Sequence, residues 1–158
     1  MLSVTEGIRQ TDAIEVFPCP QPDTSGCYIN KFFLHGIRWV PPEALASIAA
    51  LRPEARLLME PEPSNPVDPN AVAVIHADSD RRIGYVPRYL AKDVRKILEQ
   101  CGNSFTQLFV ERLNSDAPVQ QRVLCRMNSC WPEGFEPCSG ESFQPIPNGV
   151  MGDCKQSA

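Results

Sequence analysis

The loop that spans residues 60–70 carries the densest group of polar side chains in this sequence. Asn65, Asp68 and Asn70 alternate there with Pro66 and Pro69. Proline fixes φ and lacks a backbone N–H, while Asn and Asp side chains can bond nearby backbone N–H groups, so we expect a rigid loop. A preorganised loop that offers amide and carboxylate oxygens binds a small polar group at little entropic cost. In an alternative interpretation these side chains only satisfy their own turn, and both interpretations stay open.

The sequence contains fewer basic than acidic side chains. The chain has 15 Lys and Arg against 19 Asp and Glu, a formal charge of −4, which argues against a polyanion binder that acts through bulk electrostatics. Any nucleic-acid site must therefore be local and small. One row of basic side chains falls on a single face of a predicted helix: Arg88, Lys92, Arg95 and Lys96. This row is either a solvated surface or a path for phosphate groups.

The inventory of catalytic and metal-binding residues is poor, so we expect no enzyme, no cofactor and no metal. Only His35 and His76 are available as histidine bases, and no nucleophile elbow, phosphate loop or HExxH helix occurs. None of the seven cysteines forms a CxxC pair, which disfavours zinc. We expect unpaired thiols, with Cys101 and Cys125 in the core.

The hydrophobic pattern predicts the elements that must hold these residues in place. Proline at 41 and 42 favours a helix start. Pro87 opens a second predicted helix that ends before Gly102, with an apolar stripe of Leu90, Val94, Ile97, Leu98 and Cys101. Short apolar or alternating runs predict six strands, at residues 32–37, 56–60, 71–76, 82–86, 106–110 and 119–127. This order favours a mainly β (α+β) fold, a small and partly closed barrel, over a parallel α/β sheet.

Composition divides the chain into three parts. Proline and glycine punctuate both ends, so we expect an irregular extension over residues 1–31, a folded domain over 32–127 and a tail rich in Pro, Gly and Cys over 128–158. The first 14 residues lack the apolar run of a signal peptide, and no segment approaches the length of a membrane span. We therefore expect a cytoplasmic protein with no membrane partner.

Three sequence motifs follow one another in a specific order. They are Phe33-Leu34-His35-Gly36-Ile37-Arg38-Trp39, then Leu58-Met59-Glu60-Pro61 with Asn65-Pro66-Val67-Asp68-Pro69-Asn70-Ala71-Val72-Ala73-Val74, then Ile83-Gly84-Tyr85-Val86-Pro87-Arg88. In this order they resemble the pattern of the HIRAN domain family, which occurs as a free-standing bacterial protein and as the front module of eukaryotic translocases. The resemblance implies an OB-like, six-stranded β-barrel with two α-helices that captures the 3′ end of single-stranded DNA.

The resemblance also implies roles for individual residues. Arg38 would meet a phosphate or a base, Trp39 would stack on a base, and Asp68 would accept the 3′-hydroxyl. Asn65 would line that pocket, and Gly84 and Tyr85 with Arg88 would flank the last phosphates. The predicted nucleic-acid-binding residues are Arg38, Trp39, Asn65, Asp68, Asn70, Gly84, Tyr85, Arg88 and Lys92.

One departure from the family pattern bears on affinity. End-binding members place an aromatic residue just before the motif aspartate, whereas this chain has Val67. The Trp39 ring can supply the missing stacking surface only if it is exposed. In an alternative interpretation, Trp39 and Tyr85 are both aromatic residues of the core. The predicted function is a non-catalytic DNA-binding module in repair or replication-associated processing, with a helicase or nuclease as an open further partner. The alternative is a small barrel that binds a protein or peptide.

Overall fold

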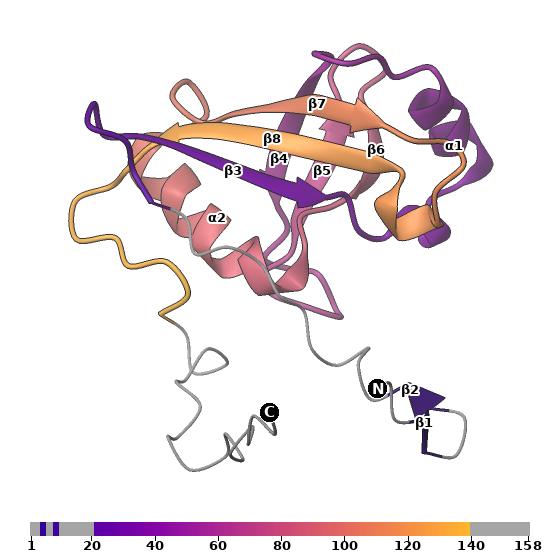
Figure 1. Ribbon diagram of the computed structural model, residues 1–158, viewed down its shortest axis with the longest axis horizontal. Helices are drawn as coiled ribbons and strands as arrows, with labels where there is room; N and C mark the ends of the chain where they lie inside the picture. The colour runs from indigo at the N-terminus through magenta and orange to yellow at the C-terminus, as the bar shows by residue number, and fades with distance from the viewer. Residues whose placement is uncertain (1–3, 6–7, 10–20, 140–158) are drawn as a thin grey trace, which may run out of the picture.

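The computed structural model describes residues 4–5, 8–9 and 21–139, and it confirms the predicted mainly β fold. Its centre is a six-stranded antiparallel sheet in the order β3-β8-β7-β4-β5-β6. In Figure 1, α2 lies below the strands and α1 lies at their right-hand side. The elements are β1 Val4–Thr5, β2 Ile8–Arg9, β3 Cys27–Phe33, η2 Ile37–Trp39, α1 Pro42–Ala49, β4 Arg56–Pro61, β5 Val72–His76, β6 Arg81–Tyr85, α2 Arg88–Cys101, β7 Gln107–Leu113, η3 Val119–Gln121 and β8 Val123–Cys130.

The segment that follows β3 bridges the sheet to its last strand at one point. His35 N donates to Tyr85 O at 3.0 Å, and Tyr85 N donates to His35 O at 2.9 Å. This isolated antiparallel bridge joins the end of the first strand of the sheet to the last strand, β6. The six-stranded sheet is otherwise open, and with its two α-helices it is consistent with the predicted OB-like fold.

Regular alternation and helical periodicity build the core. In β3, every second residue is buried, including Tyr28 and Phe32, and β8 shows the same alternation through Val123, Cys125 and Met127. The apolar stripe of α2 is buried against these strands. Gly102 ends α2 with φ of 73°, a conformation that glycine adopts without strain. Within the described residues, no helix is long and apolar enough to cross a membrane.

Two paired strands extend across the predicted boundaries at residues 32 and 127. β3 begins at Cys27 and pairs along its whole length with β8, which continues to Cys130. Sequence patterning missed this start because the buried Asn30 interrupts the apolar alternation. The sequence also predicts strand at Ile37 and over residues 119–121, but Ile37 begins the short 3-10 helix η2 and residues 119–121 form the 3-10 helix η3. The short β1–β2 pair lies in the extension predicted to be irregular.

The first part of the predicted tail is integral to the fold. Phe135 is only 7% exposed, and the Trp131 ring stands edge-on to both Tyr28 and Phe135, with ring centroids 5.4 Å and 5.2 Å away. Cys138 N donates to the buried Asp93 carboxylate at 2.7 Å, which holds this segment against α2. The remaining predicted tail, residues 140–158, lies outside the described residues.

The cysteines do not all behave as predicted. Cys125 is buried, as expected, and desolvation raises the pKa of its thiol to about 12. Cys101 and Cys130 form a disulfide between the end of α2 and the end of β8, which corrects the expectation of unpaired thiols. Neither residue belongs to a short motif, so only the fold reveals their proximity. In the described part of the chain, no three His, Cys, Asp or Glu side chains are grouped to hold a metal ion.

The buried aromatic of the C-terminal segment gives a test of the revised domain boundary. Phe135→Ala should lower the free energy of unfolding by about 3 kcal/mol, because it removes a buried ring and leaves a cavity. Urea denaturation of the full chain measures this change. Phe105→Ala is the matched control, since Phe105 is 70% exposed. Equal stability of the two variants would contradict the assignment of residues 131–139 to the folded domain.

Candidate functional site

A groove of about 520 Å³ opens between η2, the loop after β4 and the start of α2. Its floor and rim combine apolar, aromatic and charged side chains. Trp39 is 88% exposed and Val67 is 80% exposed, so Trp39 is not a core residue. The groove is lined by His35, Gly36, Trp39, Asn65, Val67, Asp68, Ala71, Tyr85, Val86, Arg88 and Ala91. Five of the predicted site residues therefore meet in one place: Trp39, Asn65, Asp68, Tyr85 and Arg88.

Asn65 holds the loop that forms one wall of the groove. Its Oδ1 accepts hydrogen bonds from Val67 N at 3.0 Å and from Asp68 N at 3.2 Å. Its Nδ2 donates to Glu62 Oε2 at 2.8 Å. The Asn65 side chain thus satisfies its own turn while it lines the groove. This loop is therefore rigid, because its turn is fixed by side-chain hydrogen bonds as well as by proline.

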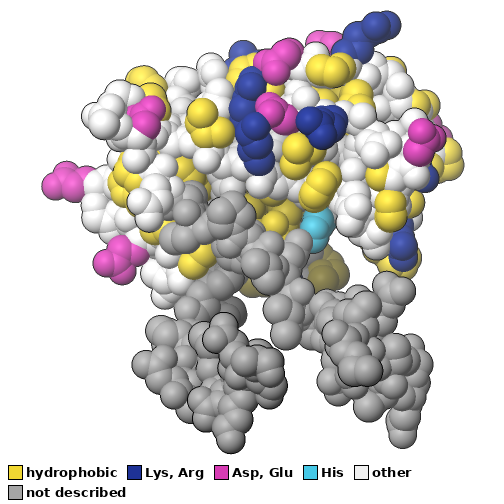
Figure 2. All heavy atoms as spheres, in the orientation of Figure 1, with side chains coloured by type: hydrophobic (Ala, Val, Ile, Leu, Met, Phe, Trp, Pro, Cys, Tyr) yellow, Lys and Arg dark blue, Asp and Glu magenta, His cyan; other side chains and the backbone are white. Residues whose placement is uncertain are grey.

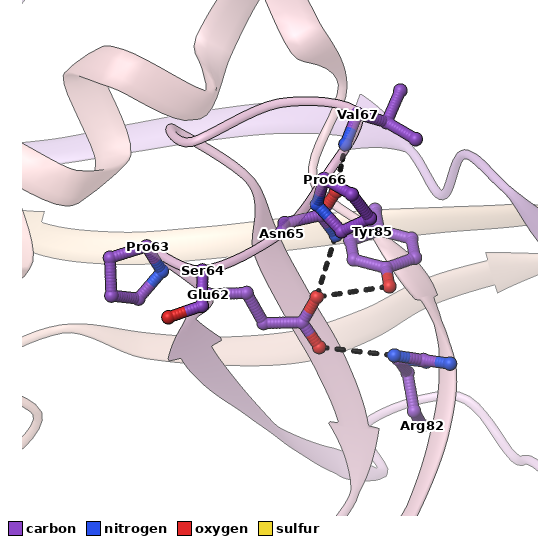
Figure 3. A pocket seen from close by; sticks show the side chains of 8 residues that line it. All are labelled: Glu62, Pro63, Ser64, Asn65, Pro66, Val67, Arg82 and Tyr85. Carbon is purple, nitrogen blue, oxygen red and sulfur yellow. Dashed lines mark hydrogen bonds and ion pairs between the residues drawn. The ribbon is translucent and has the colours of Figure 1, made fainter.

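Glu62 joins this loop to the barrel, as Figure 3 shows. Its Oε2 also accepts a hydrogen bond from the Tyr85 hydroxyl at 3.1 Å, and its Oε1 accepts one from Arg82 at 3.1 Å. Burial acts to raise the pKa of Glu62, but the hydrogen bonds from Asn65, Arg82 and Tyr85 outweigh it and lower the pKa below its usual value. Burial and the bond to Glu62 raise the pKa of Tyr85. At neutral pH Glu62 is therefore charged and Tyr85 is neutral.

Asp68 presents one partly engaged carboxylate oxygen to the groove. Its Oδ1 accepts the Asn70 backbone N–H at 2.8 Å, whereas its Oδ2 lies 3.5 Å from Arg88 Nε. This second distance is longer than a well-formed hydrogen bond, and 79% of the Arg88 side chain is exposed. An ion pair of this kind contributes little to stability. Asp68 Oδ2 can therefore accept a hydrogen bond from a ligand hydroxyl.

The other basic residues do not gather at the groove. Arg38 and Lys92 are exposed outside its lining, and Arg95 donates to Pro69 O at 2.7 Å, which braces the same loop. Of the row on α2, Arg88 therefore lines the groove, while Arg95 supports the loop. Figure 2 shows Lys and Arg mixed with Asp and Glu over the face formed by β3, β8 and β7. There Arg126 lies 2.8 Å from Glu54 and 3.2 Å from Glu111.

Two predicted site residues have structural roles instead of lining the groove. Asn70 uses its backbone N–H to fix the Asp68 carboxylate, and its side chain is not part of the lining. Gly84 is buried in β6, where an added Cβ would lie 2.5 Å from His35 O and 2.7 Å from the Leu34 side chain. Glycine is needed there because the bridge between His35 and Tyr85 brings the two backbones close. The sequence did not indicate the ion pair between Glu62 and Arg82. Glu62 follows β4 and Arg82 lies in β6, so the two residues meet only because these strands belong to one sheet.

Comparison with known proteins places the chain among HIRAN domains. The HIRAN domain family model matches residues 30–128. The crystal structure of the HIRAN domain of human HLTF has 15% sequence identity and a TM-score of 0.48, covering 67% of this chain and 80% of that chain. A crystal structure of a protein from Lactobacillus plantarum has 20% identity and a TM-score of 0.51, covering 66% of this chain and 99% of that chain, and it shares the fold. No curated protein sequence matches significantly.

The close backbone approach at Gly84 gives a stability prediction. Gly84→Ala should lower the free energy of unfolding by about 1–3 kcal/mol, because the new methyl group overpacks a closed site. It should also accelerate hydrogen exchange at the His35 and Tyr85 amides, which form the bridge. Thermal unfolding and amide exchange by NMR measure the two effects. Unchanged stability together with unchanged exchange would show that the bridge does not require glycine.

Proposed function

The chain belongs to the HIRAN family of DNA-binding domains, and on that premise we propose that its groove binds the 3′ end of single-stranded DNA. The observation that carries this proposal is the meeting of an exposed aromatic ring, Trp39, with the Asp68 carboxylate and the Arg88 guanidinium in one groove. The ring stacks on the terminal base, the guanidinium contacts a phosphate, and the carboxylate accepts the terminal hydroxyl. Stacking tolerates any base, so binding is independent of sequence.

Asp68 supplies the preference for an end. A carboxylate is a good acceptor for a free hydroxyl but repels a further phosphate, so an internal nucleotide or a 3′-phosphate is rejected. The Asp68 side chain is only 16% exposed, and the Asn70 N–H fixes its orientation. The groove therefore recognises an end by one hydrogen bond of defined position, with little contribution from long-range charge.

We propose a non-catalytic, cytoplasmic role in DNA repair or replication-associated processing, alongside a helicase or a nuclease that acts on the same end. A peptide is the second candidate ligand, because Trp39 and Val67 give the groove an exposed apolar rim. The 3′-terminal chemistry of the ligand distinguishes the two functions.

The Asp68 carboxylate gives the most specific test of end recognition. A single strand with a 3′-hydroxyl should bind about tenfold or more tightly than the same strand with a 3′-phosphate or a blunt duplex, measured by fluorescence anisotropy at one salt concentration. Asp68→Asn keeps the oxygen that accepts the Asn70 N–H but removes the charge, so it should abolish the discrimination against phosphate. Asp116→Ala is the exposed control. Equal affinity for both ends would overturn end capture, and no binding to any oligonucleotide would favour a peptide ligand.

The two exposed side chains of η2 should affect binding in different ways. Trp39→Ala should weaken binding by about 1–3 kcal/mol through lost stacking, without a change in stability because the ring is exposed. Arg38→Ala should weaken all single strands together and reduce the slope of log K against log salt by about 0.7, the value for one phosphate contact. Titrations at several salt concentrations measure both, with Phe105→Ala and Arg52→Ala as exposed controls. A fall in stability for Trp39→Ala would contradict the stacking role.

A further inference from the structure

A second hollow of about 560 Å³ adjoins the groove on the far side of the loop wall. Figure 3 shows its lining residues: Glu62, Pro63, Ser64, Asn65, Pro66, Val67, Arg82 and Tyr85. The hollow and the groove share Asn65, Val67 and Tyr85, so the two spaces meet along one rim. Its volume is within the usual range for small-ligand sites. None of the roles assigned above uses this space.

The chemistry of the hollow favours a flat and uncharged group. Two prolines and Val67 supply apolar walls beside the Tyr85 ring. The Arg82 guanidinium carbon lies 5.3 Å from the centre of that ring, and the guanidinium is paired with the Glu62 carboxylate. Because the two charges offset each other, the hollow has no net attraction for an anion, and a phosphate placed there would meet Glu62. A ring with polar edges fits better.

We propose that this hollow receives the base of the nucleotide that precedes the 3′-terminal one. This inference rests on the proposed function, because it assumes that the terminal nucleotide occupies the groove. A strand that leaves the groove over the shared rim passes Val67, which is small and 80% exposed. The next base then lies among Pro63, Pro66 and Tyr85. The protein therefore binds the last two nucleotides as two separate bases, one on each side of the rim.

Arg82 gives the second base a polar contact. Its side chain is 49% exposed, and a guanidinium has five N–H donors. The bond of 3.1 Å to Glu62 holds the group in place, while the outward donors face solvent and can bind acceptor atoms on a base edge. All four bases have such acceptors, so the contact strengthens binding with only a modest sequence preference.

The direct test removes only the second base. The full 158-residue chain is titrated with two single strands that both end in a 3′-hydroxyl, one intact and one with an abasic site at the penultimate nucleotide. The abasic strand keeps every phosphate and the terminal base. We expect it to bind roughly 5- to 100-fold more weakly, the contribution of one stacked base. Equal affinity for the two strands, with the preference for a 3′-hydroxyl retained, would overturn this inference and leave end capture intact.

A charge-balanced variant tests the role of Arg82. Glu62→Gln/Arg82→Ala removes one charge of each sign, and the glutamine oxygen can still accept bonds from Asn65 and Tyr85. It should weaken the intact strand about 3- to 10-fold more than it weakens the abasic strand. The matched control is Glu60→Gln/Arg81→Ala, an exposed pair on strands β4 and β6 that lines neither space. It should change neither affinity.

The outcomes separate the two proposals. If the Glu62→Gln/Arg82→Ala variant weakens both strands equally, Arg82 contacts a phosphate and the base-binding role is wrong. If the control pair has the same effect as the test pair, the loss is nonspecific and the inference also fails. If the unmodified protein binds neither strand, the proposed function itself is wrong, and the second base site is wrong with it.

Discussion

Two backbone hydrogen bonds between His35 and Tyr85 organise the part of the molecule that forms the groove. They join the chain that leaves β3 to the last strand of the sheet, and they exist only because Gly84 has no side chain at the point of closest approach. On one side of this bridge the chain continues directly into η2, which carries Trp39. On the other side Tyr85 reaches Glu62 through its hydroxyl. The turn and the loop that face each other across the groove are thus both fixed to one bridge.

The loop opposite Trp39 is stabilised locally before any ligand binds. Asn65 accepts two backbone N–H groups, and Glu62 accepts hydrogen bonds from three side chains. Arg95, on α2, donates to the carbonyl of Pro69 in the same loop. Binding to such a preformed surface requires little ordering of the protein. Arg88 is the one Lys or Arg side chain in the groove lining, in keeping with the net charge of −4, so the proposed function relies on shape, stacking and one carboxylate.

The sequence predicted the elements better than it predicted their contacts. The apolar stripe of α2 with Pro87 and Gly102 predicts a helix, and the observed bounds agree with that prediction to within one residue, because periodicity and end signals are local properties. The groove residues were found from motif types, yet the role of Gly84 as a packing residue depends on which strand lies opposite it. The start of β3, the disulfide and the burial of Phe135 likewise depend on contacts between distant segments. No local pattern encodes these contacts.

The two tryptophans of the chain provide the most direct test that the groove is the DNA site. Trp39 lies on the groove, while Trp131 packs against Tyr28 and Phe135 at the opposite end of β3. A heteronuclear NMR titration with a short single strand that ends in a 3′-hydroxyl follows both indole N–H signals at once. The account predicts that the Trp39 signal shifts progressively to saturation while the Trp131 signal stays in place. A shift of Trp131 with Trp39 unmoved at saturation would contradict it.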